Sequence, residues 1–271
     1  MPTPTDRITA FRQLHDSGCF VMPNPWDVGS ARLLEQLGFP ALATTSAGLA
    51  WSLGVRDTHV GRDKVLSHLR SMSAAVDVPF NADFEDGFAI DPEGVAISVD
   101  LATRTGIAGL SIEDSSDDPA NPLFDFALAV ERINAARRAI DITGTGVVLT
   151  ARSEGFITGR PDLAETIRRL TAYAEAGADC LYAPGIRSLT DMKAIVDAVA
   201  PKPVNALAST NFATVGELAD IGVRRISVGG ALARAAWTGF LEAAKEIAEQ
   251  GSFGGLARAM PGVDLDGKFG R

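Results

Sequence analysis

Short apolar or β-branched runs recur eight times along the chain, and each is followed by a segment with the apolar spacing of a helix. Strands and helices that alternate in this way predict a sheet of parallel strands. The predicted strands cover residues 20–22, 41–45, 79–82, 109–112, 147–151, 180–183, 203–206 and 225–228.

Glycine-containing turns precede several of these strands, as at 37–40, 105–108, 176–179 and 221–224. Glycine in such a turn takes the left-handed conformation that closes a helix. Eight strand–helix units without a low-complexity linker favour a closed (β/α)8 TIM barrel of the α/β class, and 271 residues suit that fold. The alternative is a doubly wound sheet, but residues 23–29 lack the Gly-x-Gly-x-x-Gly pattern of dinucleotide sites.

The C-terminal part carries an alanine-rich helix that contains aromatic residues. We predict one barrel domain at residues 1–250, which includes this last helix from Ala231 to Gln250, and a Gly-rich tail at 251–271. Trp237 and Phe240 are among the apolar residues of the helix. The helix either docks on a neighbouring subunit or packs on its own barrel.

Composition and charge narrow the class of partner. The net charge is −9, and the basic residues are scattered, which argues against nucleic acid or an anionic membrane as partner. No apolar run approaches the roughly 18 residues of a membrane span, and the N-terminus lacks the pattern of a signal peptide. We therefore expect a cytoplasmic protein that acts on small molecules.

Residue types that other mechanisms require are scarce. Cys19 and Cys180 are too few and too isolated for a disulfide scaffold or a zinc site, and the three histidines form no metal-binding or triad pattern. None of the five lysines lies at the C-terminal end of a predicted strand, which disfavours a Schiff-base aldolase. A metal-dependent aldolase of another family stays possible, with His59 as its sole candidate base.

Acidic side chains follow the predicted strands at the end where a barrel carries its chemistry. Asp83, Glu85 and Asp86 follow the third strand, Glu113 follows the fourth, and Arg152 follows the fifth. Carboxylates clustered at strand ends repel one another unless a cation neutralises them, so the pattern indicates a hard divalent ion such as Mg²⁺. The alternative interpretation is a solvated acidic turn.

Mg²⁺ takes one or two carboxylates directly and keeps several waters. Asp83 is the natural direct ligand, and Glu85, Asp57 and Glu113 would bind the waters. Arg152 could hold a substrate carboxylate with its planar guanidinium. Arg152 could instead form a structural ion pair with an adjacent glutamate.

The turn after the second predicted strand provides a further candidate anion site. The backbone N–H groups of Ser46, Ala47 and Gly48 could bind the substrate carboxylate. Alternatively, Ser46 is simply a turn residue.

Several motifs in consistent order resemble the isocitrate lyase/phosphoenolpyruvate mutase superfamily over nearly the whole chain. They are PNPWD at 23–27, TSAGL at 45–49, LGVRD at 53–57, NADFEDG at 81–87, IED at 112–114, ARSEGF at 151–156 and RRISVGG at 224–230. The resemblance implies a β/α barrel that binds Mg²⁺ and a small 2-oxo or 2-hydroxy carboxylate. It also implies a homodimer or homotetramer in which the last helix is swapped between subunits.

The resemblance also assigns roles by position. Asp83 matches the metal-binding aspartate, with Glu85 where many members have Asp. Asp57 and Glu113 match the acids that surround the metal. Ser46 matches the serine that binds the substrate carboxylate, and Arg152 matches the arginine that binds the substrate. The candidate catalytic residues are therefore Asp57, Glu113 and Arg152, and the candidate metal residues are Asp83, Glu85, Asp57 and Glu113.

Departures from the superfamily pattern limit the reaction. The Lys-Lys-Cys-Gly-His loop of the isocitrate and methylisocitrate lyases is absent, and the loop at 115–122 is shorter than that of the phosphonomutases. Pro184 stands where the phosphonomutases have a histidine. Decarboxylation through an enolate needs no such groups, so we expect a Mg²⁺-dependent lyase or decarboxylase. The alternatives are P–C bond chemistry and a non-catalytic 2-oxoacid-binding protein.

Overall fold

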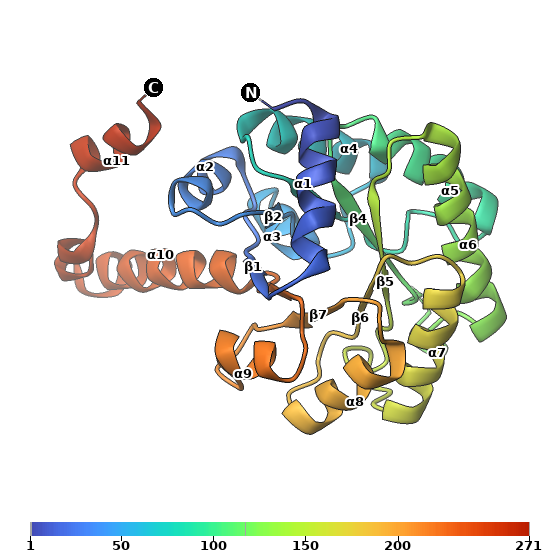
Figure 1. Cartoon of the computed structure of the whole chain (residues 1–271). Helices are drawn as coiled ribbons and strands as arrows, with labels where there is room; N and C mark the ends of the chain where they lie inside the picture. Colours follow the sequence, from blue (N-terminus) through green and yellow to red (C-terminus); the bar gives the residue numbers. More distant parts are fainter. Residues whose placement is uncertain (1, 117, 271) are drawn as a thin grey trace.

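The computed structural model describes residues 2–116 and 118–270 and contains eight parallel strands (Figure 1). In spatial order the strands are β1, β8, β7, β6, β5, β4, β3 and β2. Their bounds are β1 Phe20–Met22, β2 Leu42–Ala43, β3 Phe80–Asp83, β4 Gly109–Glu113, β5 Val148–Arg152, β6 Cys180–Tyr182, β7 Val204–Leu207 and β8 Arg225–Ser227. Ala43 N donates to Pro23 O at 3.1 Å, which joins β2 to the end of β1. The sheet is thus a nearly closed barrel, and the predicted TIM-barrel class is confirmed.

Helices connect the strands and surround the barrel (Figure 1). They are α1 Pro4–Asp16, α2 Val28–Gln36, α3 Ser46–Ser52, α4 Arg62–Ala75, α5 Pro92–Thr103, α6 Phe126–Thr143, α7 Leu163–Glu175, α8 Leu189–Val199, α9 Val215–Asp220, α10 Ala231–Gln250 and α11 Gly262–Phe269, with a 3-10 helix, η1, at Gly254–Arg258. The glycines of the predicted turns have positive φ, for example +84° at Gly38 and +92° at Gly222. These turns therefore close the helices as the sequence predicts.

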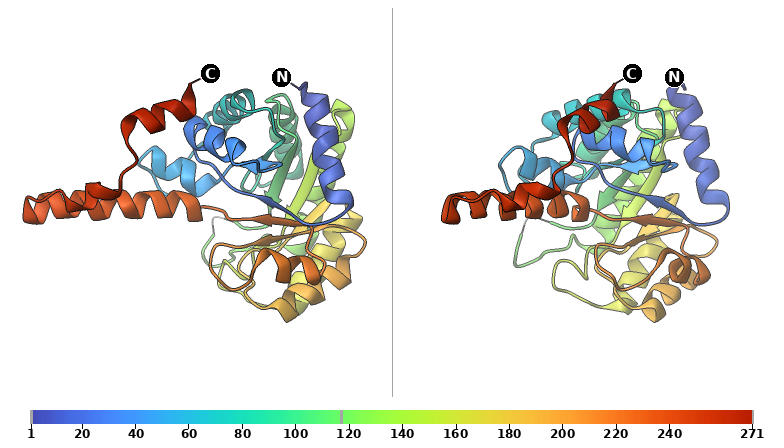
Figure 2. Two further views of the ribbon diagram at one scale, coloured as in Figure 1. Left: turned by 60° about the vertical axis from the view of Figure 1, so that its left-hand side comes forward. Right: turned by 90° about the vertical axis from the view of Figure 1, so that its left-hand side faces the viewer.

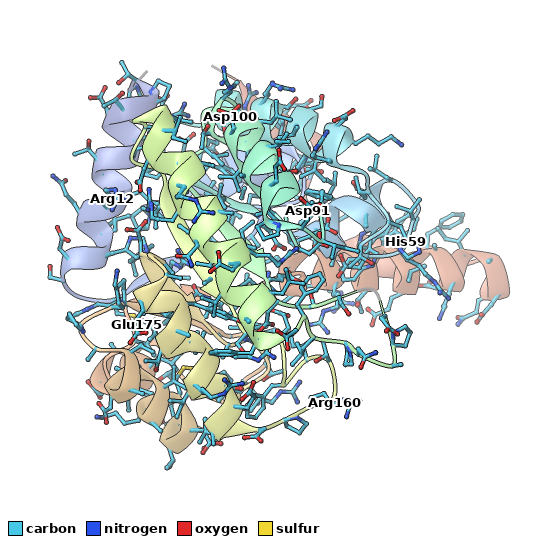
Figure 3. All side chains as sticks on the ribbon, turned by 90° about the vertical axis from the view of Figure 1, so that its right-hand side faces the viewer. Arg12, His59, Asp91, Asp100, Arg160 and Glu175 are labelled. Atoms are coloured by element: carbon cyan, nitrogen blue, oxygen red, sulfur yellow. The ribbon has the colours of Figure 1, made fainter. Side chains whose placement is uncertain are left out.

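Helix α1 covers the end of the barrel at which the strands begin. Its Phe11 is fully buried, and a Cβ on Gly109, the first residue of β4, would lie 2.6 Å from the Phe11 ring. Glycine at this position therefore allows α1 to approach the strand closely. In Figure 3, Arg12 of α1 and Glu175 lie at this end of the barrel, while His59 and Arg160 lie at the opposite end. The opposite end is the one that carries the loops following the strands.

Helix α10 projects away from the barrel (Figure 2). Ala233 is its one buried residue among those described, whereas Trp237 is 37 % and Phe240 60 % exposed. The segment after α10 is ordered as η1 and α11, and α11 returns to α2, where Gln36 Nε2 donates to Lys268 O at 2.5 Å. The helix therefore has little contact with its own barrel. Within the described residues, no helix is long and apolar enough to cross a membrane.

Buried polar residues occupy the barrel interior. Arg225 of β8 is only 1 % exposed, and it donates to Asn205 Oδ1 at 2.8 Å and to Thr150 Oγ1 at 3.0 Å. Its Nη1 lies 3.3 Å from His15 Nε2. His15 Nδ1 lies 2.7 Å from Phe11 O, which can only accept, so Nδ1 carries the proton and Nε2 accepts from Arg225. His15 is thus built into the fold as a neutral side chain.

The neutral state of His15 predicts a pH dependence of stability. Burial, with a further contribution from Arg225, lowers the pKa of His15 to about 3, whereas an unfolded chain has its ordinary value near 6.5. Below pH 6.5 the unfolded chain binds a proton that the folded chain does not, so His15 makes stability fall as the pH drops towards 3. The slope is at most about 1.4 kcal/mol per pH unit.

His15→Gln keeps a neutral hydrogen-bonding group and removes the titration. We expect the free energy of unfolding, measured with urea, to fall between pH 7 and pH 5 by up to about 2 kcal/mol more in the wild type than in the variant. An equal fall in both proteins would contradict the assignment.

Candidate active site

A cavity of about 180 Å³ opens where the strands end. Its volume suits a small acid rather than a nucleotide or a peptide. Its lining comes from most of the strands and the loops that follow them, and includes Asn24, Thr44, Ser46, Ala47, Asp57, Asp83, Arg152, Tyr182, Asn205, Arg225 and Ser227. A wider depression of about 840 Å³ lies between α5 and α6 on the outside of the barrel, but its lining includes the strongly exposed Ile142. The smaller cavity is the candidate site, because it gathers polar groups from many strand ends.

Asp83 is held firmly at the end of β3. Ser46 N donates to Asp83 Oδ2 at 3.0 Å, and Asp83 N donates to Thr44 Oγ1 at 2.8 Å. The neighbouring Thr45 caps helix α3 with its side chain. The predicted strand continued to Thr45, whereas β2 ends at Ala43: Thr44 N still donates to Asn81 O of β3 at 2.9 Å, and Thr45 already begins helix α3 as its cap.

The guanidinium of Arg152 connects three carboxylates. Its Nη1 donates to Asp83 Oδ1 at 2.7 Å and lies 2.8 Å from Glu113 Oε1. Its Nε donates to Glu154 Oε1 at 2.8 Å. The Arg152 side chain is 11 % exposed, so these ion pairs are shielded from water. The ends of β3, β4 and β5 are thereby joined around one cation.

The ion cluster has more negative than positive charge. Burial raises the pKa of Glu113 well above its usual value; Arg152 opposes this effect, and repulsion from Glu154 and Asp83 adds to it. Burial also raises the pKa of Glu154. Burial disfavours the charged form of Arg152, but the three carboxylates raise its pKa well above the ordinary value. Arg152 therefore stays charged, and a further cation or a proton would relieve the remaining negative charge.

A second buried ion pair supports the cluster from behind. Asp114 Oδ1 accepts from Glu154 N at 2.8 Å. Its Oδ2 accepts from the Tyr173 hydroxyl at 2.6 Å and from Arg169 Nη1 at 3.1 Å. Asp114 is 3 % exposed, and its contacts fix the backbone on which Glu154 sits.

Asp57 lies in the loop after α3, at the cavity edge. Partial burial raises the pKa of Asp57, although a hydrogen bond from the Ser46 side chain acts in the opposite direction. Asp57 and Asp83 are the two carboxylates that line the cavity, accompanied by hydroxyl groups such as that of Thr44. This donor set contains only oxygen, which fits a hard cation that binds one or two carboxylates and keeps its waters.

The family model described as phosphoenolpyruvate phosphomutase matches residues 11–248. This match spans the barrel and the strand-end cluster. The chain belongs to the isocitrate lyase/phosphoenolpyruvate mutase superfamily.

Three similar proteins illustrate the range of that superfamily. A crystal structure from Burkholderia cenocepacia J2315, described only as a lyase/mutase, is 45 % identical, has a TM-score of 0.95 and covers 99 % of this chain and 97 % of its own. Oxaloacetate decarboxylase of Paraburkholderia xenovorans is 32 % identical over 72 % of this chain and 67 % of its own length. A phosphonopyruvate hydrolase structure in complex with oxalate and Mg²⁺ is 25 % identical, with a TM-score of 0.85, and covers 99 % and 96 %.

The remaining predicted residues occupy distinct positions around the superfamily site. Ala47 lines the cavity, whereas Gly48 packs tightly: its N–H donates to Thr45 Oγ1 at 3.3 Å, and a Cβ there would lie 2.8 Å from Trp26. Glu85 is 7 % exposed, and its carbonyl accepts from Glu113 N at 2.9 Å, beside the ends of β3 and β4.

The predicted acids do not form a ready-made metal cage. Within residues 2–116 and 118–270, no three acidic, histidine or cysteine side chains are placed to hold a metal ion together. Arg152 stands between Asp83 and Glu113 instead of opposite a ring of four acids. The predicted outer acids Glu85 and Glu113 remain hypotheses.

The loop after β4 is a short closed turn in its described part. Ser115 pairs with Leu123 in an antiparallel bridge, and Ser116 N donates to Pro122 O at 3.0 Å. Asn121 donates to Asp118 Oδ2 at 2.9 Å and is exposed. Asn121 thus serves the turn, and Asp117 lies outside the described residues.

The sequence gives no role to Thr44, Arg225 or Ser227. It leaves open whether Tyr182 and Asn205 line the pocket or serve turns and packing. All five line the cavity. Their positions at or beside strand ends were a usable signal, because alternate residues of a barrel strand point inward. The buried arginine of β8 was the least obvious, since a charge inside a barrel contradicts the usual burial pattern.

Proposed function

We propose that the chain is a Mg²⁺-dependent lyase or decarboxylase that cleaves a C–C bond of a small 2-oxo or 2-hydroxy carboxylate through an enolate. The observation that carries the proposal is the Arg152 cluster: Arg152 and Asp83 line a small cavity, and Glu113 and Glu154 contact the same guanidinium. Such a site offers an anionic substrate a guanidinium and leaves carboxylate oxygens for a second cation.

The chain's own residues have defined parts in the proposed reaction. Asp83 would hold Mg²⁺ directly, and Asp57, Glu85 and Glu113 would accept hydrogen bonds from its waters. When bound, Mg²⁺ supplies the Lewis acidity that polarises the 2-oxo group. Arg152, with Ser46 and Ala47 beside it, orients the substrate carboxylate, and its charge favours the transition state in which the enolate forms.

Oxaloacetate is the first substrate to test, because its decarboxylation needs no protein base and a relative is named oxaloacetate decarboxylase. We expect a panel of 2-oxo and 2-hydroxy acids to include at least one that the wild type converts to pyruvate or a related 2-oxo acid with Mg²⁺ but not with EDTA. Asp83→Ala should reduce kcat/KM at least about 100-fold, since the proposed direct ligand is lost. Asp191→Ala, at the N-terminus of α8 outside the cavity, is the matched control.

The same panel separates the alternatives. Phosphonopyruvate is included and followed by phosphorus NMR, because a relative is named phosphonopyruvate hydrolase and phosphonomutases share the family model. If phosphonopyruvate is the one compound of the panel that is turned over, the result would contradict C–C cleavage and indicate P–C bond chemistry. Binding of 2-oxo acids in calorimetry without consumption of any would instead indicate a non-catalytic binding protein.

We also propose that the chain is a homodimer or homotetramer in which the exposed face of α10 packs on another copy. Trp237 and Phe240 form an edge-to-face pair with ring centroids 5.7 Å apart, and both are exposed in the single chain. Apolar surface of this kind marks an interface.

Light scattering should give a mass that is a multiple of 28.4 kDa. Replacing both residues by aspartate should shift the mass towards the monomer, whereas Ile142→Asp, at an exposed position on α6, should not. A monomeric wild type would contradict the proposal.

A further inference from the structure

A chain of hydrogen bonds leads from the barrel interior to the cavity. Arg225 Nε donates to Asn205 Oδ1 at 2.8 Å, and Asn205 Nδ2 donates to Ser227 Oγ at 2.9 Å. The Ser227 side chain in turn interacts with the Tyr182 hydroxyl and acts to lower the pKa of Tyr182, as a donor to its oxygen does. All four residues line the cavity, and they come from the three adjacent strands β6, β7 and β8.

Arg225 fixes the direction of every bond in this chain. A guanidinium has donors only, so the Asn205 side chain must turn its oxygen to Arg225 and its amino group to Ser227. Ser227 Oγ accepts that bond and keeps its single proton for the Tyr182 oxygen. The Tyr182 oxygen is then an acceptor within the chain, and its own proton is directed out of it, towards the cavity that the side chain lines.

The other contacts of Arg225 strengthen this polarity. Its further acceptors are the hydroxyl of Thr150 and the neutral His15 ring, both uncharged. In the described part of the chain, Arg225 therefore has no carboxylate among its hydrogen-bond partners. Its positive charge polarises the hydrogen bonds that lead through Asn205 to Tyr182. Arg225 and Asn205 are each only 1 % exposed, so water screens this effect weakly.

We propose that Tyr182 is the catalytic proton donor to the enolate, and that Ser227, Asn205 and Arg225 are positioning residues that aim its hydroxyl. The inference rests on the proposed function and names the protonating group of that reaction. Among the described residues that line the cavity there is no histidine, cysteine or lysine that could act instead. The two aspartates of the lining have the proposed metal-binding role.

In oxaloacetate the C3–C4 bond breaks, CO₂ leaves, and the electron pair forms the C2–C3 double bond of the pyruvate enolate. That π pair then takes the hydroxyl proton of Tyr182 at C3, the C2 oxygen becomes the ketone, and tyrosinate remains. The tyrosinate regains a proton from water. Before the step, burial raises the pKa of Tyr182 to about 12, so the hydroxyl is protonated near neutral pH.

Two cations face the tyrosinate that this step creates. The Arg152 guanidinium carbon lies 4.9 Å from the centre of the Tyr182 ring. The positive charge of Arg225, in the barrel interior, reaches the Tyr182 oxygen through Asn205 and Ser227. The new negative charge therefore forms between existing positive groups, which lowers the barrier to the transfer.

The test follows substrate loss and pyruvate formation separately, with oxaloacetate and Mg²⁺. Oxaloacetate and enolpyruvate are monitored by proton NMR, which resolves the vinyl protons of the enol, and pyruvate is measured by its methyl signal. In the wild type, pyruvate should appear as fast as oxaloacetate is lost. Tyr182→Phe should still consume oxaloacetate but release enolpyruvate, and its enzyme-catalysed conversion of enol to pyruvate should fall about 100-fold or more.

Variants of the positioning residues distinguish aiming from structure. Ser227→Ala should also release enolpyruvate, and Ser227→Thr, which restores the hydroxyl, should abolish that release. Ser71→Ala, at an exposed position on α4 outside the cavity, is the matched control for the loss of a serine hydroxyl and should release none.

The outcomes separate the two proposals. If the wild type consumes no oxaloacetate and no other acid of the panel, the proposed function fails, and this inference fails with it. If the wild type turns over and Tyr182→Phe forms pyruvate without enolpyruvate release, only the assignment of Tyr182 is overturned. Circular dichroism of each variant verifies that it is folded, and continued substrate consumption by Tyr182→Phe provides the same check from within the experiment.

Discussion

The site depends on the electrostatic balance around Arg152. Three carboxylates from three strand ends contact one guanidinium in a region largely closed to water. Breaking a buried pair by removing one partner typically costs about 3–5 kcal/mol, because it leaves a buried charge uncompensated. The charges at the three strand ends therefore depend on one another, and their surplus of negative charge makes the cluster receptive to a second cation.

The parallel barrel brings about this concentration of charge. Parallel strands end on the same face, so residues far apart in sequence, such as Asp83 and Arg152, meet without any long loop. The barrel interior adds a polar network below the cavity, with Arg225 as its buried cation. Two arginines thus line the same small cavity. Arg152 is bonded to carboxylates, whereas Arg225 is bonded to neutral groups such as the amide of Asn205 and the hydroxyl of Thr150. In the proposed reaction, both arginines would favour an anionic substrate or intermediate.

Much of this arrangement could be predicted from sequence. The strands carry local signals, apolar runs with glycine turns such as that at Gly222, and all eight overlap their predicted ranges, although β2 is shorter than predicted. The proximity of Asp83 and Arg152 was predictable, because strand ends converge in a barrel. The position of Arg152 between carboxylates was not predictable, since sequence gives no distances between side chains. The isolation of α10 was also open, because its apolar pattern suits its own barrel and a second copy equally well.

In the proposed site, Arg152 and a cation on Asp83 together bind a small planar dianion. Calorimetric titration with oxalate tests this directly, because oxalate resembles the enolate of a 2-oxo acid and needs no turnover to be observed. We predict that oxalate binds to the wild type in the presence of Mg²⁺, that EDTA weakens binding at least about 100-fold, and that Arg152→Lys, which loses the planar guanidinium, weakens it at least about 10-fold. Oxalate binding that is unaffected by EDTA and by Arg152→Lys, or no binding in any condition, would contradict the account.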